Sequence, residues 1–388
     1  MTGRHARAIW CGTACGMALA ATVVVAAQAV APAKPAEKNP YVKLAAPWPD
    51  ADTLRKRQVD AERRALFASH EPLAFTLTAD FRAIDKDRDP QSTRRFPGVL
   101  TLATQGAAPI AVQLGTRGNS RLNVRTCDFP PLRVDFPKQD GKSAVKGTVF
   151  AGQETLKLVT HYWASSTFDQ YLLREYLVYR IFNVMTPRSF RARQAVVTYV
   201  DSTNGKRIEA RPGIFIEEDG DLARRMGGRV VDLLRSQARD LDPDAATTMA
   251  ILQYMVGNTD YSIYALHNMK LVQTPALGRL LIPVPYDFDM TGLVNPYYAG
   301  VDKRLAIATV RDRLYRGPCR TMEELEPLLA VFRARQPDVL ALVDALPGLR
   351  GGDRRDVRTF LNEFYETLAR PGRVKRAFID GCRSVPTM

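Results

Sequence analysis

The fold prediction rests on four alternating segments: LAFTLT at 73–78, GVLTLA at 98–103, IAVQL at 110–114 and LRVDF at 132–136. In each segment apolar and polar side chains alternate, which is the pattern of a β-strand with one buried face. Charged or glycine-containing turns separate them, as is typical of neighbouring strands in an antiparallel sheet. We therefore predict an antiparallel sheet in this part of the chain.

The next hundred residues extend this sheet and add one helix. Leu156–Val159 has the composition of a further strand, and Thr167–Thr186 has helical periodicity. Ala195–Asp201 and Arg207–Glu217 flank Asn204-Gly205, a dipeptide that favours a tight β-hairpin turn. These residues predict a helix followed by a hairpin.

Beyond residue 218 the pattern becomes mostly helical. A short β region interrupts it at Met269–Val272 and Leu280–Val284. A β-rich half followed by a helical half predicts an α+β protein of two lobes, with a β-rich N-lobe over 71–218 and a mostly helical C-lobe over 219–388. The predicted helices of the C-lobe are 221–240, 243–257, 303–314, 321–346 and 353–370.

Composition excludes several classes of protein. The 388 residues are 46% hydrophobic and 25% charged, which excludes collagen-like, low-complexity and wholly disordered chains. Lys and Arg number 55 against 41 Asp and Glu, so the formal net charge is +14, and anionic partners are favoured. No basic stripe interleaved with aromatic residues is found, so we do not expect nucleic-acid binding. The sequence does not indicate an oligomeric state.

The N-terminus has the pattern of an export signal. Arg4 and Arg7 precede an apolar run over Ala8–Val25, and Ala27-Gln28-Ala29 offers the small residues that a signal peptidase requires. We predict a signal peptide over 1–29 and a periplasmic or secreted mature protein. The alternative is an uncleaved membrane anchor, which also leaves the rest of the chain outside the cytoplasm.

A linker and three cysteines follow the predicted cleavage point. Residues 30–70 are expected to form a Pro-rich linker and a charged helix. An oxidising compartment permits one disulfide among Cys127, Cys319 and Cys382, and we favour Cys319–Cys382 because both lie in the C-terminal third. Three free thiols are the alternative.

The stretch from 258 to 289 carries the side chains that phosphoryl transfer needs. Asp260 ends a predicted helix, Asn268 follows eight residues later, and Asp287 and Asp289 close a predicted strand. One carboxylate can accept the proton of an attacking hydroxyl, while an Asn and a second carboxylate hold Mg²⁺ against the phosphates. The alternatives are ordinary ones: Asp260 as a capping or turn residue, Asn268 as a buried amide, and the two other acids as a loop pair.

A second group of candidates lies on the predicted strand and helix before it. Lys157 sits between leucines on a strand, and Glu175 lies on the apolar face of the next helix. A buried carboxylate is costly without a partner, so we predict that these two residues form an ion pair that anchors a nucleotide. An ion pair of Glu175 with Arg174 is the alternative. The Gly-rich turn from Gly115 carries Arg117 and Arg121 and could cover phosphates, although it matches no Walker or dinucleotide motif and an ordinary turn is the favoured alternative.

Taken together, these motifs resemble the spore coat protein H (CotH) kinase-like family. The resemblance covers roughly residues 110–295, and it implies an atypical, two-lobed protein-kinase-like fold. It also implies transfer of a phosphoryl group from ATP, with Mg²⁺ or Mn²⁺, to a Ser/Thr-type hydroxyl. The gap from Asp260 to Asn268 is longer than in protein kinases, and Asp289 stands where those enzymes have Gly. The motifs are Arg117-Gly-Asn-Ser, Leu156-Lys-Leu, Glu217, Asn258-x-Asp260, His267-Asn268 and Pro285-Tyr-Asp-Phe-Asp.

The resemblance implies a role for each candidate residue. Asp260 is expected to be the catalytic acid. Lys157, Glu175, Arg117 and Glu217 are expected to bind the nucleotide, with Glu217 at the hinge between the lobes. Metal ligation is expected from three residues: Asn268, Asp287 and Asp289.

Three functions are consistent with these residues. The first is an exported kinase that acts on a protein or a small molecule bearing a hydroxyl. The second is a catalytically silent kinase-like domain that binds partners in the cell envelope, where ATP is scarce. The third is a metal-dependent hydrolase built on Asp287 and Asp289.

Overall fold

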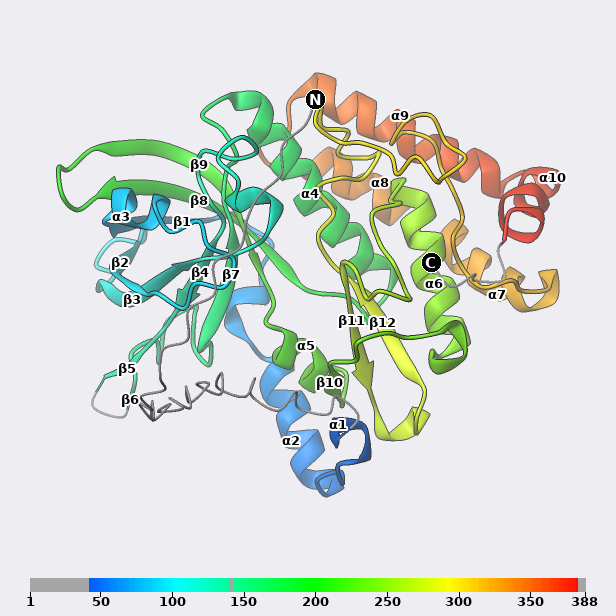
Figure 1. Ribbon diagram of the computed structural model, residues 1–388, viewed down its shortest axis with the longest axis horizontal. Coiled ribbons are helices and arrows are strands. Elements are labelled where there is room, and N and C mark those ends of the chain that lie inside the picture. Colours follow the sequence, from blue (N-terminus) through cyan, green and yellow to red (C-terminus); the bar gives the residue numbers. More distant parts are fainter. Residues whose placement is uncertain (1–41, 140–141, 383–388) are drawn as a thin grey trace, which may run out of the picture. The chain divides into compact units, whose positions relative to one another are not determined.

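The computed structural model describes residues 42–139 and 142–382 (Figure 1). The described residues belong to one compact unit. The predicted signal peptide and most of the predicted linker lie outside them. None of the described helices is long and apolar enough to cross a membrane.

Seven strands form a closed barrel. All neighbouring pairs are antiparallel except β1 and β8, which pair in parallel from Leu73 opposite Ala195 to Ala79 opposite Asp201 and close the barrel. Inward-facing side chains such as Phe75, Leu77 and Phe215 fill it. In barrel order the strands are β1 (Leu73–Ala79), β2 (Phe96–Leu102), β3 (Ile110–Thr116), β4 (Leu132–Asp135), β7 (Thr155–Val159), β9 (Arg207–Ile216) and β8 (Ala192–Asp201).

A second core joins the outside of the barrel to the helices. Helix α4 (Ser166–Met185) packs against β9 and α8 (Figure 1), and most of its side chains are buried. Val159 and Ile216, at the ends of β7 and β9, belong to the same core. The other helices of this core are α6 (Pro243–Val256), α7 (Met322–Ala334), α8 (Gln336–Ala345), α9 (Gly351–Leu368) and α10 (Pro371–Val374).

A small three-stranded sheet completes the part that positions the candidate site. Its strands are β10 (Arg229–Val231), β11 (Met269–Gln273) and β12 (Leu281–Pro285), in that order and antiparallel. The remaining elements are α1 (Val42–Ala45), α2 (Ala51–Glu62), α3 (Phe81–Asp85), α5 (Asp219–Arg225) and the short strands β5 (Lys138–Gln139) and β6 (Lys142–Ser143).

The predicted two-lobed, kinase-like arrangement is wrong. The strands close into a mixed barrel instead of forming the antiparallel sheet of an N-lobe. Helix α4 was expected to belong to that lobe, but it is buried in one core with α6, α8 and α9. A helix that is apolar on nearly every side must be covered on every side. It therefore joins the barrel to the helical part of the molecule.

Two predicted helices are also wrong. The segment expected to be helical over 221–240 contains the end of α5, then β10 and a short 3-10 helix at Ala238–Asp240, because Gly227 has a φ of 68° and ends α5. Residues 303–314 form turns, with Asp312 accepting hydrogen bonds from backbone N–H groups of the turn. In contrast, the predicted Cys319–Cys382 disulfide is present, and Cys127 is a buried free thiol.

Candidate functional site

The β11–β12 hairpin brings Asn268 and Asp287 to one end of the small sheet. Met269 pairs with Pro285, so the residues just outside the ladder are neighbours, and the Tyr286 N–H donates to the Asn268 carbonyl over 3.0 Å. Asn268 and Asp287 have φ values of 54° and 63°. This left-handed conformation is uncommon for residues other than Gly and is often found at functional sites. A polar residue in this conformation therefore precedes β11, and another follows β12.

Asp260 lies beside this end of the hairpin. Its backbone N–H donates to the Asn258 side chain over 2.9 Å, which fixes the turn after α6. The Asn268 amide donates to Asp260 Oδ2 over 3.0 Å and to its carbonyl over 2.8 Å, and His267 Nε2 lies 3.2 Å from Oδ1. The side chain of Asp260 is nevertheless 42% exposed. Its carboxylate is thus oriented by two neighbours and open to a substrate.

A small cavity of about 60 Å³ lies next to these residues. Arg121 is held there by a hydrogen bond from its guanidinium to the Thr160 carbonyl over 2.7 Å and lies 3.6 Å from the centre of the Tyr162 ring. The Tyr162 hydroxyl donates to Asp289 over 3.0 Å. The charged residues that line the cavity are Arg117, Arg121, Lys157, Glu175, Asp287 and Asp289.

The environment of the three acids in this cavity disfavours their charged forms. Burial, followed by the charge of Asp287, raises the pKa of Asp289 to about 7. Burial also raises the pKa of Asp287. Glu175 is 2% exposed and its Oε2 has no hydrogen-bond partner, so burial and the two Asp charges raise its pKa as well. Such a cluster gains stability from any cation that enters it.

The acids suit a metal ion that arrives with phosphates. Within residues 42–139 and 142–382, no three His, Cys, Asp or Glu side chains converge closely enough to hold an ion by themselves. Mg²⁺ in proteins is commonly bound by one or two carboxylates together with substrate phosphates and water. Asp287 and Asp289 can supply those carboxylates. The residues therefore fit a metal–nucleotide complex better than a resident ion.

The predicted Lys157–Glu175 ion pair is replaced by another. The Lys157 amino group donates to Asp219 Oδ1, and Lys270 lies 3.1 Å from the other carboxylate oxygen. Burial lowers the pKa of Lys157, and the charge of Asp219 opposes that shift. Ile216, the last residue of β9, pairs with Lys157, and Asp219 lies shortly after it in the chain. The Asp219 carboxylate therefore lies close to the Lys157 amino group. Lys157 and Glu175 still line the same cavity.

Glu217 is placed away from the cavity lining. It is 1% exposed and accepts hydrogen bonds from the Arg225 guanidinium over 3.0 and 2.9 Å. It also accepts a hydrogen bond from the Arg191 backbone N–H over 3.0 Å, and the Arg191 guanidinium lies 4.0 Å from its Oε1. These contacts make Glu217 a buried ion-pair partner that ties β9 to α5. Arg117, by contrast, lines the cavity as expected.

Sequence reasoning missed several residues of the site. Asp219 and Lys270 hold or flank Lys157, and Tyr162 positions Asp289. Lys270 lies between buried residues of β11. A charged residue within an otherwise apolar strand is the sequence signal that could have identified it. Neither Asp219 nor Tyr162 carries a local pattern that distinguishes it from an ordinary surface acid or core aromatic.

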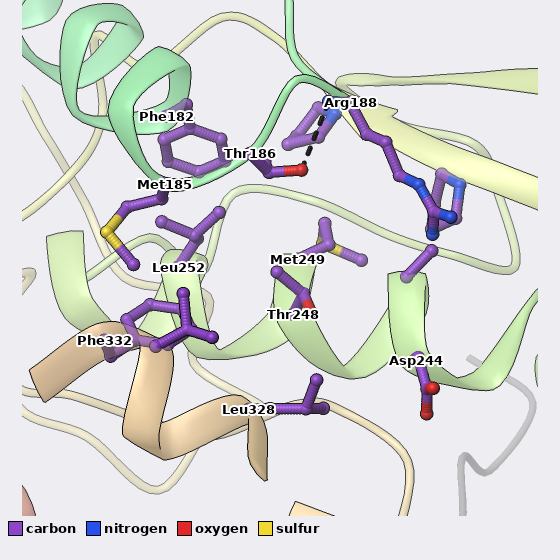
Figure 2. Close-up of a pocket in the computed structure, with 14 residues that line it drawn as sticks. Phe182, Met185, Thr186, Arg188, Asp244, Thr248, Met249, Leu252, Leu328 and Phe332 are labelled. Carbon is purple, nitrogen blue, oxygen red and sulfur yellow. Dashed lines mark hydrogen bonds between the residues drawn. The ribbon is translucent and has the colours of Figure 1, made fainter. Parts of the chain in front are cut away.

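A second cavity, of about 260 Å³, lies between the end of α4, α6 and α7 (Figure 2). Its walls are apolar, with Phe182, Leu252 and Phe332 among them. Its two charged residues are already paired, Arg188 with Asp242 and Asp244 with Arg320. Its other polar side chains are the hydroxyls of Thr186 and Thr248, whereas the smaller cavity gathers six charged side chains, so the smaller charged cavity is the candidate functional site.

Comparison with known proteins adds no identification. No protein-family model matches the chain, and no curated protein matches it. The resemblance to the CotH family therefore stays a prediction, and function must be argued from the site itself.

Proposed function

We propose that the chain is a phosphotransferase that moves a phosphoryl group from a nucleotide, bound with Mg²⁺ or Mn²⁺, to a hydroxyl group of a protein or small molecule. In this proposal the substrate oxygen attacks the terminal phosphorus, and the bond from phosphorus to the leaving nucleoside diphosphate breaks. Asp260 accepts the hydroxyl proton. Catalysis of this kind consists mainly of positioning and charge stabilisation.

The observation that carries the proposal is the meeting of Asp260 with the end of the β11–β12 hairpin. Asn268 bonds to Asp260, and Asp287 begins the loop on the neighbouring strand. An exposed, oriented carboxylate thus lies near the carboxylates of Asp287 and Asp289 and the cations Arg117 and Arg121. This is the combination of proton acceptor, metal ligands and phosphate-binding cations that the reaction requires.

The metal, when bound with the nucleotide, would neutralise the phosphates and polarise the terminal one. Asp287 and Asp289 would hold it, and loss of hydration raises the pKa of each carboxyl despite the nearby arginines. Arg117, which lines the same cavity, would supply a positive charge to the phosphates. Lys157, held by Asp219, would contribute a further positive charge there.

A silent nucleotide-binding domain is the second candidate. It is favoured by the small volume of the charged cavity. Such a domain would bind a nucleotide without transferring its phosphate. The two candidates differ in a single measurable property, which is turnover.

The test is to follow release of nucleoside diphosphate and labelling of hydroxyl-bearing acceptors by γ-labelled ATP with Mg²⁺ or Mn²⁺. Asp260→Asn should lower transfer by 100-fold or more while leaving ATP affinity nearly unchanged, because general-base catalysis contributes about 10²–10⁴-fold. Binding without transfer in the wild type would favour the silent domain. No binding of ATP with either metal would exclude both.

We also propose that the mature protein acts outside the cytoplasm. The Arg4/Arg7 start, the apolar run and Ala27-x-Ala29 support this, and a Cys319–Cys382 disulfide fits an oxidising compartment. N-terminal sequencing of the exported protein should begin at residue 30. A chain that begins at Met1 and stays in the membrane fraction would favour the anchor.

A further inference from the structure

We propose that the hydroxyl acceptor is part of an acidic peptide, whose carboxylates are bound by Arg316 and Arg235 near Asp260. This inference rests on the proposed function, since it names the substrate class of the same site. The residues that carry it lie on and around the loop from residue 257 to 268, which joins α6 to β11. Asp260 is the only acid of that loop, and its side chain is 42% exposed. The charges around it therefore decide which substrates can approach it.

The loop has a fixed shape, and a second segment lies against it. Ser262 and His267 exchange two backbone hydrogen bonds, of 3.2 and 3.1 Å, so the chain doubles back between them. The Ser236 N–H donates to the Tyr264 carbonyl over 3.2 Å, and the Ser236 hydroxyl donates to the Ile263 carbonyl over 2.7 Å. Residues 234–236 are therefore held beside the loop.

Arg316 contacts the loop next to Asp260. Its Nη1 donates to the Thr259 carbonyl over 2.7 Å and to the Tyr261 carbonyl over 2.8 Å, the residues directly before and after Asp260. Within the described part of the chain this guanidinium makes no other hydrogen bond and no ion pair, and its other two nitrogens are not enclosed. They can therefore bind a carboxylate of a substrate.

Arg235 supplies a second cation further along the loop. Its guanidinium donates to the Tyr264 hydroxyl over 2.7 Å and lies 5.2 Å from the centre of that ring. The residue is exposed, and no carboxylate of the described residues forms an ion pair with it. Leu234, directly before it, is 66% exposed. An apolar side chain and a cation are thus presented together, which suits a peptide that carries apolar and acidic side chains.

Two acids near these arginines already have partners. Asp302 pairs with Arg304 over 2.5 Å, and Asp232, in the segment that leads to Arg235, pairs with Lys43 over 2.6 Å. They do not neutralise Arg235 or Arg316 by direct contact. Arginines that lack a protein partner commonly recognise acidic motifs of a binding partner. The surface beside Asp260 is therefore complementary to carboxylates.

The contacts also indicate where the acids of the peptide belong. Arg316 bonds to the backbone on both sides of Asp260, so its carboxylate partner must be close to the acceptor hydroxyl. An extended chain advances about 3.3 Å per residue, which places this acid within about three positions of the acceptor Ser or Thr. Arg235 contacts Tyr264, further along the loop, and would bind an acid further from the acceptor.

The experiment measures binding of fluorescein-labelled peptides to the full chain by anisotropy, at low salt and with Mg²⁺ and a non-hydrolysable ATP analogue. Each peptide has a central Ser flanked on both sides by Asp, Ala or Lys. We expect the Asp peptide to bind at least about 10-fold more tightly than the Lys peptide. Arg235→Gln and Arg316→Gln should each weaken binding of the Asp peptide by about 2- to 5-fold. With ATP in place of the analogue, transfer to the three peptides should follow the same order.

The control is Arg358→Gln, which removes the same charge from α9, where Arg358 bonds to Asp344 over 2.6 Å. It should leave the affinities for all three peptides as they are in the wild type. If Arg316→Gln does not fold, because two loop carbonyls lose their donor, Arg235→Glu decides and should weaken the Asp peptide while strengthening the Lys peptide.

Each outcome decides the inference. Equal affinity for the Asp and Lys peptides, or tighter binding of the Lys peptide, would overturn it. So would an equal loss in Arg358→Gln and Arg235→Gln, which would show an effect of net charge only. ATP turnover with a non-peptide acceptor, and no labelling of any peptide, would overturn the inference and leave the proposed function in place. No turnover with any acceptor would overturn the proposed function, whatever the peptide affinities.

Discussion

At the scale of single residues, the candidate site contains charged carboxylates that lower the stability of the folded protein. Glu175 is buried beside the more accessible Asp287 and Asp289, and Arg117 and Arg121 compensate the three carboxylates only in part, since all three carboxyl pKa values remain raised. Stability and activity commonly conflict at sites of this kind. The same cluster therefore makes measurable predictions about stability that do not depend on knowing the substrate.

Replacing Asp289 with Asn should stabilise the protein at neutral and alkaline pH. The pKa of Asp289 is 3.8 in the unfolded chain and about 7 in the folded one, so the unfolded state loses its proton first as pH rises. Wild-type stability should therefore fall between about pH 4 and pH 7, whereas Asp289→Asn lacks this loss. At pH 8 the gain should be up to about 4 kcal/mol.

Urea unfolding at pH 5 and pH 8 measures this effect. The control is Asp52→Asn on the exposed side of α2, which should keep the wild-type difference between the two pH values. A gain of the same size at both pH values would mean that Asp289 is not the group that titrates.

The partner of Lys157 can be tested by a double-mutant cycle. Lys157→Met and Asp219→Asn should each lower the free energy of unfolding, and the double variant should lose less than the sum, with a coupling of about 1 kcal/mol for this partly exposed pair. The matched cycle of Lys157→Met with Glu175→Gln should show less coupling, because Lys157 and Glu175 are not paired. Strong coupling in the second cycle and none in the first would show that Lys157 pairs with Glu175 and not with Asp219.

At the scale of elements, the largest error of sequence reasoning concerns the segment after α5. Its composition favours a continuous helix over 221–240, but Gly227 and Gly228 end the helix and start β10. A side chain at Gly228 would place its Cβ 2.2 Å from the Gln273 carbonyl oxygen on β11. Only glycine permits this close approach of the two backbones.

Gly228→Ala should therefore destabilise the small sheet. The strands must move apart to accept the methyl group, and overpacking of this kind costs about 1–3 kcal/mol. The measurement is the midpoint of urea unfolding, together with ATP affinity, since β11 leads to Asn268. Gly351→Ala, in the first turn of α9 where a Cβ meets only ordinary contacts, is the control and should be neutral or stabilising. Equal effects of the two substitutions would contradict this account.

At the scale of the whole molecule, two long-range connections determine the fold. The parallel pairing of β1 with β8 closes the barrel, and α4 packs its core against helices far along the chain. A third connection is covalent. The Cys319–Cys382 disulfide closes a segment with a sequence separation of 63 residues, which contains α7, α8 and α9.

Removal of the disulfide should lower the free energy of unfolding by about 4 kcal/mol, on the chain-entropy estimate for a loop of this length. The double variant Cys319→Ser/Cys382→Ser tests this by urea unfolding, with and without a reducing agent. The wild type should fall to the level of the variant when reduced, and the variant should not respond. Equal stability of the oxidised wild type and the variant would show that the bond does not contribute.

Local patterns in the sequence determined much of this protein. Alternation located the strands from Leu73 to Asp135, the Asn204-Gly205 turn located the β8–β9 hairpin, and acids at the end of an apolar strand indicated Asp287 and Asp289. Each of these features depends on residues that are close together in the chain, so it can be recognised from the sequence alone. The convergence of Asp260 and Asn268 also follows from a short separation along the chain.

Only the tertiary structure decided the rest. Closure of the barrel pairs residues more than 100 positions apart, and the partner of Lys157 lies 62 positions away at Asp219. No local periodicity specifies such contacts, because every buried strand face and every unpaired charge has several potential partners in the unfolded chain. Packing selects one of them, and in this protein residues 42–139 and 142–382 form a single compact unit in place of the two predicted lobes.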